Sequence, residues 1–77
     1  MAILEMFRVR KVDPKHPRRD GEGAGRIGWD RKAGAVRFPA SCPVPRAALK
    51  MIKRCLQDGW PYGAVADSGS IWVFDPD

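Results

Sequence analysis

Residues 46–58 (RAALKMIKRCLQD) separate into an apolar side and a cationic side when they are placed at about 100° per residue, the spacing of an α-helix. The apolar arc, about 160° wide, holds Ala48, Leu49, Met51, Ile52, Cys55 and Leu56. The opposing arc of about 100° holds Arg46, Lys50, Lys53, Arg54 and Gln57. This pattern predicts a surface helix that buries one side in a core and presents its cations to solvent or to an anionic partner.

Proline and glycine mark both ends of this helix. Pro45 suits the first turn, because a backbone N–H there would have no partner within the helix. Gly59 suits the left-handed conformation that ends many helices, and Pro61 prevents the helix from continuing. We expect Trp60 and Tyr62 to fold back over the helix end.

An alternating segment near the start of the chain predicts the first strand. Between residues 3 and 12, Phe7 and Val9 point to one side, while Arg8 and Arg10 point to the other. The two arginines are therefore expected on the outward side of a sheet.

The next segment lacks anchors for a core. Residues 13–25 contain prolines, glycines and cations, with Ala24 as the single apolar residue. Such a composition favours a mobile, basic, glycine-rich loop. Arg18 and Arg19 would be available there to an anionic partner.

Two hairpins complete the expected sheet. Residues 26–29 and 35–38 alternate around a turn in which Gly34 suits a positive φ angle. Residues 63–66 and 71–74 flank a second, tighter turn. The first hairpin is expected to bury Ile27, Trp29, Val36 and Phe38 and to point Arg26 and Arg37 outward.

The last strand is apolar on both sides, because Ile71 and Val73 alternate with Trp72 and Phe74. A single helix covers only one face of a sheet. We therefore expect Trp72 and Phe74 to form an interface, with a homodimer as the favoured form.

Together these elements predict an α+β fold in one domain over residues 1–77. Its antiparallel sheet is expected to have about five short strands in the order β-β-β-α-β-β, with the amphipathic helix packed on one face.

Composition favours a soluble, cytoplasmic protein without a metal or cofactor. No apolar run approaches the ~20 residues that span a bilayer, and Glu5 and Arg8 interrupt the apolar start that a signal peptide requires. Cys42, Cys55 and His16 supply too few ligands for a structural zinc site. A Cys42–Cys55 disulfide is the less favoured alternative to two free thiols.

The residue types and their spacing contain no catalytic arrangement. His16 lies in a proline-rich segment, and Ser41, Ser68 and Ser70 lie in turns. The glycines within residues 21–25 do not lead from a strand into a helix, as a phosphate-binding loop would. The sequence therefore predicts a binding protein rather than an enzyme.

Charge is distributed unevenly, because all 14 Lys and Arg residues precede position 55, while four of the nine acids follow it. Such a basic portion suits an acidic protein surface, a nucleoprotein complex or nucleic acid itself. The candidate partner-binding residues are Arg46, Lys50, Lys53 and Arg54 of the helix, Arg8, Arg10 and Arg37 of the strands, and Arg18 and Arg19 of the loop. A merely solvated polar face is the competing interpretation.

The chain resembles, in type, the small inhibitors carried by phages and mobile elements, of which anti-CRISPR proteins are the best-known class. The shared features are its length, its lack of catalytic residues, and a helix followed by a terminal hairpin that ends Ile71-Trp72-Val73-Phe74. The resemblance implies a protein that binds a host protein or nucleoprotein complex, such as a Cas complex, and blocks its target recognition. The alternative is a stand-alone nucleic-acid-binding module that uses the basic helix side and the basic loop.

Overall fold

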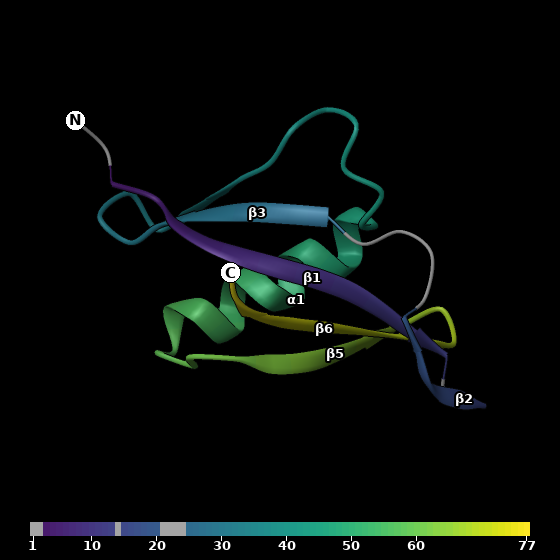
Figure 1. Cartoon of the computed structure of the whole chain (residues 1–77). Coiled ribbons are helices and arrows are strands. Elements are labelled where there is room, and N and C mark those ends of the chain that lie inside the picture. Colours follow the sequence, from purple (N-terminus) through teal and green to yellow (C-terminus); the bar gives the residue numbers. More distant parts are fainter. Residues whose placement is uncertain (1–2, 14, 21–24) are drawn as a thin grey trace.

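The computed structural model describes residues 3–13, 15–20 and 25–77 (Figure 1). Its elements in chain order are β1 (Glu5–Asp13), β2 (His16–Asp20), β3 (Gly25–Asp30), β4 (Ala35–Arg37), α1 (Arg46–Gln57), β5 (Gly63–Asp67) and β6 (Ser70–Pro76). The sheet is antiparallel, with the order β4-β3-β1-β6-β5 and with β2 paired to one end of β1. The predicted α+β class and the β-β-β-α-β-β order are confirmed, and β2 is an additional short strand.

The expectation of a continuous loop over residues 13–25 is wrong in part. The β1–β3 ladder ends at Val9, whereas β1 itself continues to Asp13. β2 pairs with this overhanging end of β1. Backbone groups can form a ladder without apolar side chains, so the composition gave no sign of this strand. Residues 14 and 21–24 lie outside the described part of the chain.

The helix α1 packs with its predicted apolar side against the sheet (Figure 1). Its buried residues are Ala48, Leu49, Ile52 and Leu56, with Met51 and Cys55 partly buried at the margin. Pro45 occupies the position just before the first turn rather than a place within it, and its carbonyl accepts a hydrogen bond from the Leu49 N–H at 3.0 Å.

Two backbone hydrogen bonds close the end of the helix at Gly59, where the sequence predicted a residue in the left-handed conformation. The Gly59 N–H donates to the Leu56 carbonyl at 3.1 Å, the Trp60 N–H donates to the Cys55 carbonyl at 3.0 Å, and Gly59 has a φ of 89°. This pattern is a Schellman motif. The expected folding back of Trp60 and Tyr62 over the helix end is wrong, because their exposed fractions are 58% and 65%.

The core lies between α1 and the inner face of the sheet. The sheet residues buried there are Phe7, Val9, Ile27, Trp29, Val65, Trp72 and Phe74. The rings of Phe7 and Phe74 meet edge to face, with their centroids 6.3 Å apart. Burial of these apolar side chains contributes favourably to folding, because it removes their surface from water.

The expected interface at Trp72 and Phe74 is wrong. β6 lies between β1 and β5, and both side chains point from it into the core, where they are 5% and 0% exposed. Ile71 and Val73, on the other side of β6, are half-buried. Alternation was assigned correctly, but the sequence did not say which of the two apolar sides would face the helix.

The β3–β4 turn follows the prediction at Gly34 and departs from it at Phe38. Gly34 has a φ of 65°, and the Asp30 Oδ1 accepts a hydrogen bond from the Ala33 N–H at 3.0 Å. Phe38, however, is 45% exposed, because β4 ends one residue earlier, at Arg37.

Candidate binding surface

One side of the sheet is turned away from α1, and no described helix or strand covers it (Figure 1). We call this side the open face. Successive side chains of a strand point to opposite faces, so the partners of the buried residues define it. Its members are Met6, Arg8, Arg10 and Val12 of β1, Arg26 and Gly28 of β3, Arg37 of β4, Ala64 and Ala66 of β5, and Ile71, Val73 and Asp75 of β6.

The open face brings together four arginines from three neighbouring strands. Arg8 and Arg26 are direct partners across the β1–β3 ladder, and Arg10 follows Arg8 on the same side of β1. Arg37 is the partner of Gly28 across the β3–β4 ladder. The outward orientation predicted for these arginines is confirmed, and the strand order places them in a diagonal row.

Two carboxylates near the end of β6 balance part of this charge. The Arg26 Nε lies 2.9 Å from the Asp77 Oδ2, and the Arg10 Nη2 lies 3.8 Å from the Asp75 Oδ2. Arg8 and Arg37 form no ion pair with any described residue. The described open face is therefore positive overall, and its cations are all arginines.

Apolar side chains lie among these arginines. Met6 is 45% exposed, and Val12 is half-buried beside Ile71 of β6. Leu4 covers Gly28, because a Cβ at Gly28 would lie 3.0 Å from the Leu4 Cδ1. Such a mixture of arginine and partly exposed apolar surface is typical of protein interfaces.

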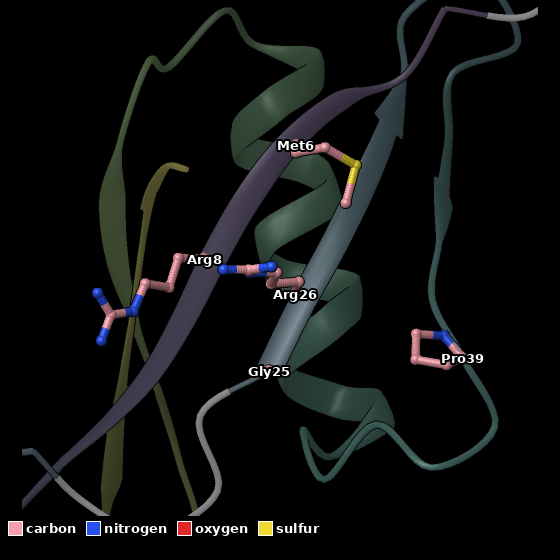
Figure 2. Close-up of a pocket in the computed structure, with 5 residues that line it drawn as sticks. All are labelled: Met6, Arg8, Gly25, Arg26 and Pro39. Atoms are coloured by element: carbon pink, nitrogen blue, oxygen red, sulfur yellow. The ribbon is translucent and has the colours of Figure 1, made fainter.

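An open depression of about 420 Å³ lies on this face between the β1–β3 strands and the segment after β4. Its lining residues are Met6, Arg8, Gly25, Arg26 and Pro39. Figure 2 shows Met6 and Arg26 on one side of the depression and Pro39 across from them.

The helix cations form a second basic surface on the opposite side of the molecule. This helix stripe consists of Arg46, Lys50, Lys53 and Arg54. Lys53 is half-exposed, the other three are exposed, and none forms an ion pair with a described residue. The apolar side of α1 contacts the sheet, so the stripe points away from it.

The candidate residues predicted from sequence are thus divided between two surfaces. One flat partner cannot cover the open face and the helix stripe together. Arg18 and Arg19 belong to β2, and their side chains lie outside the described part of the chain.

Four of the described residues that line the depression were not among the sequence candidates for partner binding. Arg26 carried a usable signal, since it alternates with the apolar Ile27 and Trp29. Met6, Gly25 and Pro39 carried no such signal, because strand pairing and the course of the chain after β4 bring them together.

The described residues contain no group of three His, Cys, Asp or Glu side chains that could hold a metal ion. Within the same part of the chain, no helix is long and apolar enough to cross a membrane. Cys42 and Cys55 are free thiols in the structure.

No protein-family model, curated protein or solved structure matches this chain.

Proposed function

We propose that this chain is a non-catalytic binding protein that uses the open face to recognise an acidic protein surface or nucleoprotein complex. The observation that carries the proposal is a row of arginines from three strands, set among partly exposed apolar side chains on an uncovered sheet face. Arginine forms bidentate hydrogen bonds with carboxylates and loses less entropy per bond than lysine. Such a protein would act by occupying its target, as inhibitors of the anti-CRISPR type do.

A capture experiment with matched variants tests this proposal. The immobilised chain is exposed to a host extract before and after nuclease treatment, and the same is done with two double variants. Arg8→Glu with Arg37→Glu alters the open face, and Lys50→Glu with Lys53→Glu alters the helix stripe. Both variants lower the net charge equally, so any difference between them reports the position of the charge.

The expected result is a protein partner that survives nuclease treatment and is lost only with the open-face variant. Reversal of two interface charges should weaken binding by about tenfold or more. Retention of the partner by the open-face variant, together with loss by the helix-stripe variant, would contradict the assignment to this face. Loss of every partner on nuclease treatment would contradict protein binding.

A second candidate is a stand-alone nucleic-acid module that uses the helix stripe. The observation in its favour is that none of the stripe's four cations is paired with a described acid, so each is available to a phosphate. Neutralising Lys50, Lys53 and Arg54 together would then remove most affinity for bare DNA. The slope of log affinity against log salt would fall by about one unit for each lost contact on duplex DNA.

A further inference from the structure

The depression on the open face contains an unusual pair of neighbours. Arg8 and Arg26 lie directly opposite each other on β1 and β3 and point to the same side of the sheet. Like charges in this arrangement repel each other and destabilise the strand pair. An anion between or beside them would remove that repulsion.

Asp77 provides such an anion for Arg26, but neither Asp75 nor Asp77 forms an ion pair with Arg8. In Figure 2, Arg26 extends from β3 toward β1, and its Nε lies 2.9 Å from the Asp77 Oδ2. Asp75 is the partner of Arg8 across the β1–β6 ladder, yet it forms an ion pair with Arg10. Its Oδ1 is buried and accepts no hydrogen bond from the described residues. Among the described residues, no carboxylate forms an ion pair with Arg8.

The other described residues of the lining are Met6, Gly25 and Pro39, and none of them is charged. The Met6 side chain and the Pro39 ring stand on opposite sides of it, and Gly25 contributes no side chain to its floor (Figure 2). A group that fits these walls has a short apolar body and a negatively charged end. Glutamate and aspartate side chains have this form, and Asp77 already demonstrates carboxylate binding at Arg26.

A nucleotide fits the same depression less well. Proteins that hold single-stranded nucleic acid stack its bases on aromatic rings. The five described residues that line the depression include no aromatic side chain. The lining therefore favours a protein carboxylate over a nucleotide.

We propose that this depression receives an acidic side chain of a protein partner, which binds Arg8 and displaces Asp77 from Arg26. The inference rests on the proposed function and deepens it by naming the group that the partner presents. The Asp77 carboxylate acts as an internal competitor, so its removal strengthens binding of the acidic segment. The apolar part of the incoming side chain lies beside Met6, because the Arg8 guanidinium extends from β1 away from Pro39 (Figure 2).

Titration of the full chain with a labelled peptide, Glu-Leu-Glu-Leu-Glu, tests the inference by fluorescence anisotropy. The matched peptide Gln-Leu-Gln-Leu-Gln and an oligothymidylate of similar length serve as comparisons. Arg8→Gln and Arg26→Gln should each weaken binding of the acidic peptide by about fivefold or more. Lys32→Gln removes the same charge from an exposed turn residue outside the depression, and should change binding by less than about twofold.

Asp77→Asn is the decisive variant, because it should increase the affinity for the acidic peptide, by about threefold or more. Asp58→Asn adds the same net charge at the exposed end of α1 and should have little effect. Should Arg26→Gln fail to fold, as judged by circular dichroism, Arg8→Gln and Asp77→Asn still decide the matter.

Equal effects of Arg8→Gln and Lys32→Gln, or no strengthening by Asp77→Asn, would overturn the inference. Variant effects on the oligothymidylate alone would overturn it in favour of a phosphate site. The titration uses no host partner, so its outcome is separable from the capture experiment. The open-face variant could lose the host partner while Arg8→Gln and Asp77→Asn leave peptide binding unchanged. That result would support the proposed function and contradict this inference.

Discussion

The aromatic ring of Phe74 lies against the backbone of Gly63, its direct partner across the β5–β6 ladder. A Cβ at Gly63 would stand 3.0 Å from the Phe74 Cζ and 3.1 Å from its Cε1. Phe74 is fully buried, so its ring has little room to move aside. The missing side chain at position 63 is therefore part of the core packing.

Gly63→Ala should lower the free energy of unfolding by about 1–3 kcal/mol, as overpacking of a filled core does. Urea denaturation followed by circular dichroism measures the change. Ala66→Ser, at an exposed position of the same strand, is the control and should stay within about 0.5 kcal/mol. An unchanged stability for Gly63→Ala would mean that the ring can withdraw from β5.

The two sides of α1 should respond very differently to truncation. Ile52 is fully buried in the core, and Ile52→Ala should lower the free energy of unfolding by about 2–5 kcal/mol. Lys50→Ala, on the helix stripe, should change it by no more than about 0.5 kcal/mol. Similar losses for both variants in a denaturation series would contradict the orientation of the helix.

Removal of the Asp30 carboxylate should loosen the β3–β4 turn. Asp30 is 7% exposed and accepts a hydrogen bond from the Ala33 N–H, so Asp30→Ala should cost about 1–2 kcal/mol of unfolding free energy. Arg31→Ala breaks a pair with Glu5 in which the arginine side chain is 73% exposed, and should cost less than about 1 kcal/mol. The thermal unfolding midpoints of the two variants give the comparison, and the reverse order would count against the turn's role.

The β5–β6 turn offers a stabilising change. Its two central residues, Ser68 and Gly69, have φ angles of 50° and 79°, the geometry of a type I′ turn. Asparagine tolerates the left-handed region better than serine, so Ser68→Asn should raise stability by about 0.5 kcal/mol. Differential scanning calorimetry should show a rise in Tm of about 2–4 °C. Ser41→Asn, at an exposed position with ordinary φ, should give no such rise, and a lower Tm for Ser68→Asn would show that the turn has another geometry in solution.

Local patterns in the sequence predicted the elements that depend on neighbouring residues. The helix over residues 46–57 follows from the placement of Leu49, Ile52 and Leu56 at helical spacing, and Gly59 and Gly34 marked positions where only a residue without a side chain adopts positive φ at little cost. Such features need no knowledge of distant segments. The α+β class followed because a single amphipathic helix requires an apolar sheet face to cover it.

Contacts between distant segments decided the rest. Trp72 and Phe74 were indistinguishable from Ile71 and Val73 as a core side, because β6 is apolar on both faces and only the position of α1 selects between them. The strand β2 forms because β1 continues beyond its ladder with β3, and no local sequence pattern indicates this difference in length.

The candidate binding surface shows the same division. Alternation along each strand was enough to place Arg8, Arg26 and Arg37 on an outward side. Only the strand order and register set Arg8 opposite Arg26 and brought Asp77 within 2.9 Å of Arg26. The physical reason is that alternation fixes the direction of a side chain from its own backbone, whereas its neighbours depend on hydrogen bonds between strands that lie far apart in the sequence.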